Sequence, residues 1–357
     1  MKHQSILSAA LLTLVTSGAM AQSSVTVGGI LDSAVRVVHN EGGGSVKSVV
    51  SGSNQTSRLY FRGEEDLGSG LAAGFWLESG VNVDTGTAVG GTQFFDRRAT
   101  LSLVSRGVGE LRMGRDYVPT YTIWSRHDPY THVGVAGSNN FSSSSQLGPI
   151  RSAFGTGPNT TVRSSNAVEY LLPSGLGGVE GGLMVAAGEG GTAANGQDKL
   201  VGGRIGWQAD SFGVHAAHVT TSNDLTTSGK FKDTLLAVNG AVANVRLTAA
   251  LRRYEQAAAK ESILLLSATV SLGQVEVKAS YLKADMKGKV GSTSIDANDA
   301  TQFGIGAIYN LSKRSALYVQ GARISNDGRA TFSIPGGTAM VAGGNSTGWE
   351  AGLRHNF

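Results

Sequence analysis

Residues 58–79 read RLYFRGEEDLGSGLAAGFWLES, and this stretch decides the fold. Leu59 and Phe61 fall on one face of an extended chain, whereas Arg58 and Arg62 fall on the other. The chain alternates in the same way after the turn-forming centre DLGSG. A period of two between apolar and polar positions indicates a β-strand with one greasy and one polar face. The stretch therefore predicts two antiparallel strands joined by a short turn.

The same alternation continues to the end of the chain in segments of about ten residues, which is the length of a tilted membrane-spanning strand. Short turns are expected near residues 66–70, 105–109, 173–178, 209–213, 243–244, 272–274 and 311–314. Long loops are expected near residues 39–56, 84–93, 118–162, 189–197, 223–231, 255–261, 287–300 and 325–345. Short and long connections alternate, as in outer-membrane barrels. The expected fold is all-β, a 16-stranded antiparallel transmembrane β-barrel.

The composition excludes several classes of protein. The 357 residues include 51 glycines and are 40% hydrophobic, too polar for a helical membrane protein and too apolar for disorder. After Ala21 no window approaches the roughly 20 apolar residues of a spanning helix, so a membrane form must be a closed barrel. The chain has no cysteine, which excludes disulfides and thiolate metal sites. A net charge of +4 gives no indication of a nucleic-acid partner.

Residues 1–21 have the pattern of a secretory signal peptide. Lys2 supplies the positive charge, residues 6–15 the apolar core, and residues 19–21 (Ala-Met-Ala) a cleavage site. We expect removal of this segment to leave a single barrel domain at 22–357.

Sequence motifs for enzymatic chemistry are missing. The chain contains no Gly-x-Ser-x-Gly, Walker, His-Glu-x-x-His or EF-hand pattern. The Gly-x-Gly pattern at 68–70 lies between two expected strands and is interpreted as a turn. His127 and His132 lack an identified acidic partner for a metal. We therefore expect a protein that is not an enzyme and holds no cofactor or metal.

The loop at 118–162 is unusually long. A structureless stretch of this length in a compact domain is usually functional. A sixteen-stranded barrel leaves an aqueous lumen, and a loop that folds inward narrows it. The alternative is a long mobile loop on the surface.

The chain ends in an aromatic residue on an alternating strand. Leu353, His355 and Phe357 share one face of this strand. A terminal aromatic fits a position in the interfacial girdle of an outer-membrane barrel. We expect these three residues to act as a C-terminal signal for the barrel-assembly machinery.

Seven short motifs together are specific enough to suggest a family. They are VTVGGILD (25–32), RLYFRGEEDLG (58–68), LESG (77–80), DTG (84–86), GRDY (114–117), NAVEY (166–170) and GLRHNF (352–357). Taken jointly they resemble the general diffusion porins of β-proteobacteria. The resemblance is strongest over the first half and the last strand, and vague between about residues 195 and 340.

The resemblance implies a homotrimer of barrels in outer-membrane lipid, with the third loop folded into each lumen. It also implies a constriction in which a basic wall faces acids on that loop. The matching basic positions are Arg58, Arg98 and Arg163, and the candidate acids are Asp128 and Asp116. The loop is poor in acids, which places the acidic wall in question.

These features predict a passive, water-filled channel for small hydrophilic solutes and inorganic ions. Solutes in such a channel are sorted by pore width and by charge at the narrowest point. Three arginines against one or two carboxylates predict a preference for anions. The alternatives are a substrate-specific channel, a barrel that presents its loops as an adhesin or carries a hydrolase site, and a soluble secreted β-sandwich.

Overall fold

The computed structural model describes residues 24–142, 147–188, 198–223 and 226–357. The signal segment at 1–21 and the loop expected at 189–197 lie outside the described residues. The strands are β1 (Ser24–Asn40), β2 (Gly44–Ser51), β3 (Arg58–Gly68), β4 (Leu71–Asn82), β5 (Thr87–Ala88), β6 (Arg98–Ser105), β7 (Gly109–Tyr117), β8 (Arg163–Leu171), β9 (Val179–Ala186), β10 (Leu200–Gln208), β11 (Phe212–Thr221), β12 (Phe231–Val242), β13 (Val245–Gln256), β14 (Ala259–Leu272), β15 (Val275–Val290), β16 (Thr293–Ser294), β17 (Ala300–Asn310), β18 (Ser315–Asn326) and β19 (Asn345–Asn356). The helical segments are α1 (Pro119–His127), α2 (Asn139–Ser142), α3 (Pro149–Phe154) and the 3₁₀ turn η2 (Thr226–Ser228).

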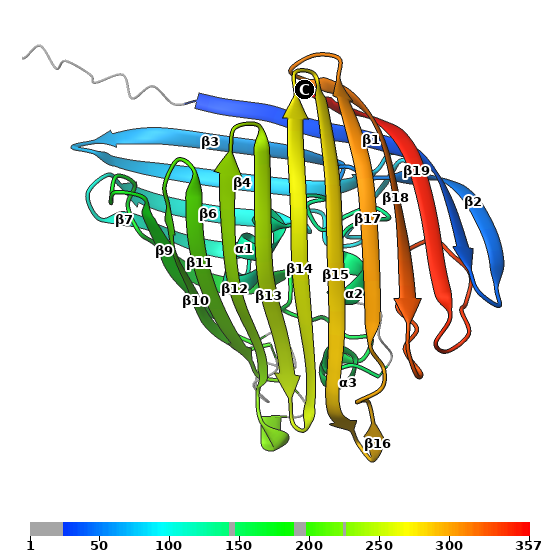
Figure 1. The fold of residues 1–357 in the computed structure, drawn as a ribbon. Helices are drawn as coiled ribbons and strands as arrows, with labels where there is room; N and C mark the ends of the chain where they lie inside the picture. Colours follow the sequence, from blue (N-terminus) through cyan, green and yellow to red (C-terminus); the bar gives the residue numbers. More distant parts are fainter. Residues whose placement is uncertain (1–23, 143–146, 189–197, 224–225) are drawn as a thin grey trace, which may run out of the picture.

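The strands form one closed antiparallel sheet (Figure 1). Each strand pairs with its neighbour in the chain, and β1 pairs with β19 to close the ring. β2 and β3 both pair with the same side of β1, so they form one interrupted strand, while β5 and β16 are two-residue segments inside loops. This leaves 16 spanning strands and confirms the predicted fold class.

The connections follow the expected alternation, with three corrections. The loop expected at 255–261 is only a tight turn, because Ala257 adopts a positive φ of 51° and β14 begins at Ala259. The loop expected at 39–56 contains β2, since Gly42 turns the chain back with a φ of 81°. The loop expected at 287–300 is shortened because β15 continues to Val290. These errors share a cause: polar strand ends that project beyond the wall resemble loops in sequence.

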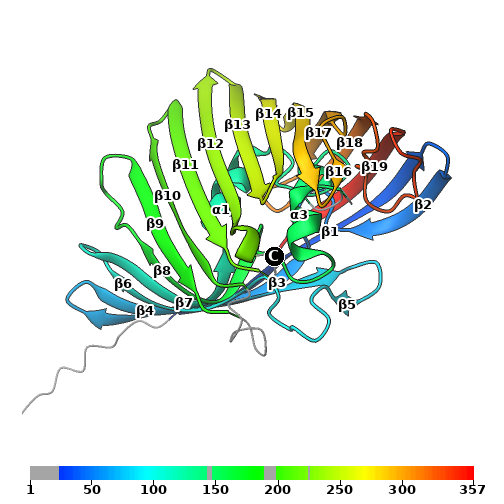
Figure 2. The ribbon, with the colours of Figure 1, turned by 90° about the horizontal axis from the view of Figure 1, so that it is seen from below.

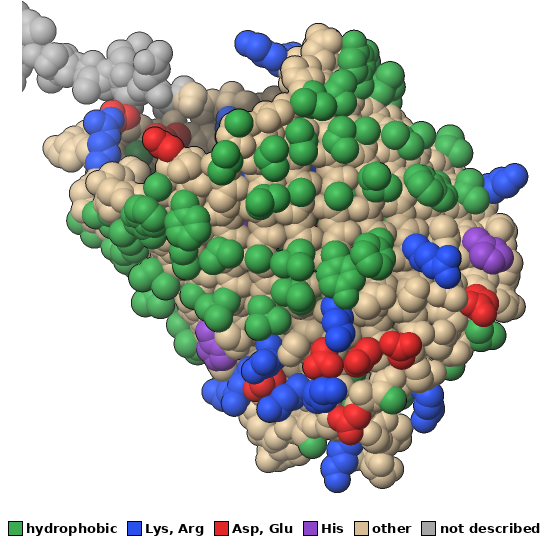
Figure 3. Space-filling model, viewed as in Figure 1, with side chains coloured by type: hydrophobic (Ala, Val, Ile, Leu, Met, Phe, Trp, Pro, Cys, Tyr) green, Lys and Arg blue, Asp and Glu red, His purple; other side chains and the backbone are tan. Residues whose placement is uncertain are grey.

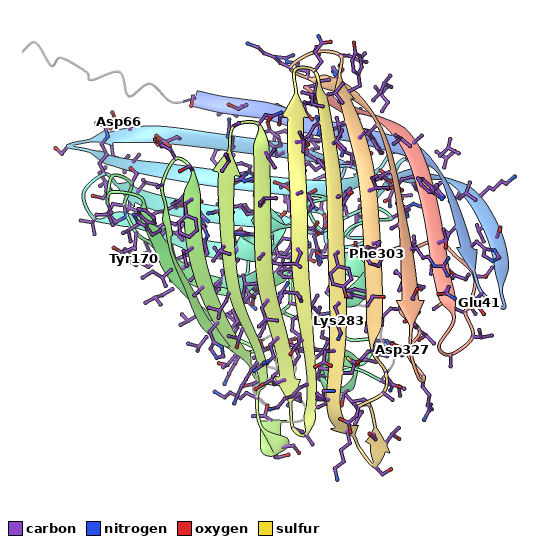
Figure 4. The ribbon with its side chains drawn as sticks, in the orientation of Figure 1. Glu41, Asp66, Tyr170, Lys283, Phe303 and Asp327 are labelled. Carbon is purple, nitrogen blue, oxygen red and sulfur yellow. The ribbon has the colours of Figure 1, made fainter. Side chains whose placement is uncertain are left out.

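Two rims result, a short-turn rim and a long-loop rim. In Figure 4, Asp66 lies at the short-turn rim, whereas Glu41 and Asp327 lie at the long-loop rim. Both described ends of the chain, Ser24 and Phe357, lie at the short-turn rim.

The outer surface carries an apolar belt. Large apolar side chains face outward at alternate positions, among them Leu183 (66% exposed), Phe303 (63%) and Trp349 (55%). Rows of apolar side chains cross the upper and middle parts of the face shown in Figure 3, and charged side chains gather toward the long-loop rim. Such a belt between polar rims matches the surface that an outer-membrane barrel presents to lipid. None of the described helices is long and apolar enough to cross a membrane.

The C-terminal residue is fixed by the strand that closes the barrel. The N–H of Phe357 donates to the carbonyl oxygen of Gly29 at 3.1 Å, and the N–H of Gly29 donates back at 3.2 Å. Leu353, His355 and Phe357 are all exposed on the outer face, as their shared parity predicts. Their role in assembly stays a prediction.

A charge placed in the apolar belt tests the orientation of the wall. Leu266 lies in the middle of β14 and is 43% exposed. We expect Leu266→Arg to lower the free energy of unfolding in lipid vesicles by about 2–4 kcal/mol, because the guanidinium would face hydrocarbon. Val108→Arg, in an exposed short turn, is the control and should change it by less than about 1 kcal/mol. Equal costs for the two variants would contradict this orientation.

Candidate functional site

The loop at 118–162 lies inside the barrel. Figure 2 shows α1 and α3 within the ring of strands. α1 contacts the wall from β9 to β13, and α3 contacts β13 and β14. Farther along the wall, a Cβ built at Gly304 would lie 2.9 Å from the Cβ of Ala136. The start of the loop also packs against β8, where Val118 and Tyr121 cluster with the buried Ala167. The loop therefore covers the inner face from β8 onward and leaves most of the inner face of β3 to β7 open to the lumen.

An apolar core lies between the loop and the wall. Trp124, Tyr130 and Phe141 of the loop are at most 1% exposed. The ring of Phe141 packs edge-on against Phe332 of the last long loop, with 5.0 Å between the ring centroids. Burial of an aromatic or large aliphatic side chain contributes about 1.5–3 kcal/mol, so this core favours a docked loop over a solvated one.

Asp128 organises the loop from within. Its carboxylate accepts hydrogen bonds from the backbone N–H groups of Tyr130, His132 and Ser138 at 2.8–3.0 Å, and from the Ser138 hydroxyl at 2.5 Å. Burial raises the pKa of Asp128, although these hydrogen bonds act in the opposite direction. The residue is 2% exposed, so the structure places this predicted pore acid inside the loop and away from the lumen.

The two loop histidines are also internal. The ring nitrogens of His132 lie within 2.9 Å and 3.2 Å of the hydroxyls of Ser138 and Ser142. Burial lowers the pKa of His132 to about 3 and that of His127 to about 4, so both imidazoles are uncharged at neutral pH. Within the part of the chain that the structure describes, no three His, Asp or Glu side chains lie close enough to hold a metal.

Charged pairs fix the loop to the covered wall. The guanidinium of Arg252 on β13 donates to the Asp233 carboxylate at 2.6 and 3.0 Å and to the Thr161 carbonyl at 2.7 Å. The Thr120 hydroxyl at the start of α1 donates to Asp233 at 2.5 Å. On β19, Glu350 accepts from the backbone N–H of Val135 at 3.0 Å.

A second segment, residues 52–57, joins β2 to β3 and bends into the lumen. The buried carboxylate of Asp32 on β1 accepts from the backbone N–H groups of Ser53, Asn54 and Gln55 at 2.8–3.1 Å. The Tyr318 hydroxyl donates to the same carboxylate at 2.6 Å. Asp32 thus holds the segment that carries Gln55 and Thr56 to the pore.

The loop edge, this segment and the open wall enclose a cavity of about 270 Å³, which we call the constriction. It is lined by Gln55, Thr56, Arg58, Arg97, Tyr117, Tyr121, Thr122, Ser125, Arg126 and Thr131. Three lining residues are arginines, and none of the lining residues is acidic.

A buried carboxylate sits behind the basic wall. Glu78 on β4 pairs with Arg97 at 2.5 Å and with Arg58 at 3.3 Å, and its side chain is 4% exposed. Arg97 also donates to the Tyr117 hydroxyl at 2.6 Å. Glu78 thus holds both guanidinium groups, and both arginines line the constriction.

The structure places the predicted residues at different points. Arg58 lines the constriction, while Arg163 lies beside it, with its guanidinium carbon 4.7 Å from the centroid of the Tyr117 ring. Arg98 lines a neighbouring cavity toward the short-turn rim and pairs with Asp116 at 3.3 Å. Asp116 is 4% exposed and belongs to β7, so its predicted place on the loop is wrong.

Sequence reasoning missed two arginines of the constriction. Arg97 directly precedes β6, so the alternation that places Arg98 inside does not describe its neighbour. Arg126 lies on α1 and pairs with Glu180 on β9, a contact between distant parts of the chain. Helical spacing within the loop could have indicated Arg126. Positions 122, 125 and 126 share one face of a helix, and Thr122, Ser125 and Arg126 line the same cavity.

Removal of the Asp128 acceptor tests its role. In Asp128→Asn, an amide replaces the oxygen that accepts three hydrogen bonds, so we expect the free energy of unfolding to fall by about 1–3 kcal/mol. Open-channel current noise should rise, while the ratio of anion to cation permeability stays constant. Asp84→Asn, an exposed carboxylate on another long loop, should change neither property. A marked gain in anion permeability in Asp128→Asn would show instead that Asp128 faces the pore.

Comparison with known proteins gives consistent matches. A family described as Gram-negative porin matches residues 8–329. The chain is 33% identical over 368 residues to outer membrane porin protein 32 of Delftia acidovorans, with 98% of each protein covered. Its structure is similar to the anion-selective porin from Comamonas acidovorans, with a TM-score of 0.79 and 28% identity over 94% of this chain and 100% of that chain. The trimer form of OmpT from Vibrio cholerae shares the fold at 14% identity, with a TM-score of 0.62 over 94% of this chain and 99% of that one.

Proposed function

Because the chain belongs to the Gram-negative porin family and is therefore an outer-membrane channel protein, we propose that its channel selects small anions at the constriction. Solutes cross passively through water, and selection comes from the width and the charge of the narrowest point. The family and the fold indicate a channel rather than an enzyme.

The observation that carries the proposal is that the lining of the constriction holds positively charged residues and no negatively charged ones. Arg58, Arg97 and Arg126 line it, and the nearest carboxylates, Glu78 and Glu180, pair with these arginines instead of facing them across the opening. Asp128 is the one acid of the loop at 118–162, and its carboxylate is buried among the loop's own donors. An anion in the opening therefore meets guanidinium groups on both sides.

The geometry makes this charge effective. The field of a charge is weakly screened in a narrow lumen surrounded by a low-dielectric wall. Arginine suits such a site because its guanidinium stays charged and is weakly hydrated. The similar porin from Comamonas acidovorans is described as anion-selective, which supports the same preference here.

We also propose that three copies assemble as a homotrimer in outer-membrane lipid. The trimer form of the similar Vibrio cholerae barrel supports this assembly. Phe357, which follows β19 at the short-turn rim and is exposed on the outer face, is the proposed contact for the assembly machinery.

The zero-current potential across a planar bilayer under a salt gradient tests the selectivity. We expect the wild-type protein to favour anions, and Arg97→Gln to reduce the permeability ratio by about threefold or more, because one of the three guanidinium charges that line the constriction is lost. Arg98→Gln should have a smaller effect, since Arg98 pairs with Asp116 outside the constriction. Arg314→Gln, in an exposed short turn, is the control and should match wild type. Cation preference in the wild-type channel would refute the proposal.

A further inference from the structure

A second cavity, of about 440 Å³, lies next to the constriction on the side of the short-turn rim. Arg62, Trp76 and Arg98 line it, together with Glu64, Glu110 and Arg112. Arg62 lies four residues beyond Arg58 along β3 toward that rim. In the family this rim faces the periplasm, so a solute would meet this cavity on the periplasmic side of the constriction.

Trp76 supplies a fixed aromatic surface to the lining of this cavity. Its indole N–H donates to Glu78 at 3.1 Å, and its ring lies 5.7 Å from that of Tyr60 between centroids. Trp76 is on β4, which pairs with β3 on one side and with β6 on the other. The guanidinium carbon of Arg62 comes from β3 and lies 5.4 Å from the indole centroid, while that of Arg98 comes from β6 and lies 4.7 Å away.

Both guanidinium groups keep unused donors. Among the residues that the structure describes, Arg62 forms no ion pair or hydrogen bond, so it is held against aromatic rings without a counter-ion. Arg98 uses its Nε for Thr100 and Asp116, at 3.3 Å each, and its terminal nitrogens have no described partner. By contrast, Arg112 pairs with three carboxylates, those of Glu110, Asp116 and Glu169.

We propose that Arg62, Trp76 and Arg98 form a binding site for small planar monocarboxylates, such as aromatic carboxylates, on the periplasmic side of the constriction. A guanidinium binds a carboxylate through two parallel hydrogen bonds, which a spherical halide cannot accept. The flat body of the solute stacks on the indole of Trp76.

A single carboxylate fits this site better than two. Glu64 is exposed on the same face of β3, two residues beyond Arg62. Its charge repels a second carboxylate carried at the far end of the solute. The inference rests on the proposed anion channel and adds a solute class that the constriction alone does not define.

The test uses the purified full-length protein in planar bilayers with potassium chloride on both sides. Benzoate, cyclohexanecarboxylate and terephthalate are the probes, and the concentration of each that halves the chloride current is measured. In wild type we expect benzoate to block at the lowest concentration. Arg62→Gln should raise the half-blocking concentration of benzoate by about tenfold, which corresponds to the loss of one charge-assisted contact.

Further variants separate the contacts. Trp76→Leu should abolish the difference between benzoate and its saturated analogue, because only the planar ring stacks on indole. Arg62→Lys keeps the charge but loses the planar fork, so its half-blocking concentration should fall between those of wild type and Arg62→Gln. Arg106→Gln removes a positive charge from an exposed turn at the same rim, and its half-blocking concentration of benzoate should equal that of wild type.

The inference is overturned if the half-blocking concentration of benzoate in Arg62→Gln lies within about twofold of the wild-type value. It is also overturned if Arg106→Gln raises that concentration as much as Arg62→Gln does, since unspecific attraction would then explain the block. The zero-current potential of each variant, measured alongside, reports on the constriction separately. Cation preference in wild type would refute the proposed function, whereas an unchanged benzoate block in Arg62→Gln with anion preference retained would refute only this site.

Discussion

The function of this barrel depends on how the loop at 118–162 packs against one half of the inner wall. Sixteen strands enclose a lumen wider than their own side chains can fill. The loop fills part of that space with an apolar core around Trp124 and Phe141. The buried carboxylate of Asp128 accepts hydrogen bonds from backbone N–H groups in the turns of the loop. Because the loop covers the wall from β8 onward, solutes meet the opposite wall, where the arginines lie.

The basic wall also depends on contacts with buried or partly buried partners. Each arginine is held by a specific partner, either a buried carboxylate such as Glu78 or an aromatic ring such as Trp76. A partly buried cation needs such partners, since an unpaired charge away from water is costly. The partners lie behind or beside the guanidinium groups, so the side facing the water keeps a positive potential. The contacts that stabilise these arginines therefore also position the charges that select the solute.

The strands were predictable because each residue's face follows from its parity, as Arg58 and Leu59 show. Parity also placed Arg98 on the inner face, but it could not give the depth of Arg98 along the pore. Asp128 shows what sequence patterns cannot predict in loops. Its position in the sequence suggested an acid facing the pore, but the backbone N–H groups that it binds come together only in the folded loop. Arg126 and Glu180 meet only because α1 docks on β9, which no local pattern encodes.

A disulfide between loop and wall tests the docked loop most directly. The chain has no cysteine, so Ala136→Cys with Gly304→Cys introduces a single pair. A Cβ at position 304 would lie 2.9 Å from the Cβ of Ala136, which small shifts bring into the range of about 3.5–4.5 Å that a disulfide spans. We predict complete cross-linking on mild oxidation, with conductance and anion preference unchanged. Failure to cross-link, or a severalfold change in conductance once the bond forms, would contradict a loop that rests against this wall.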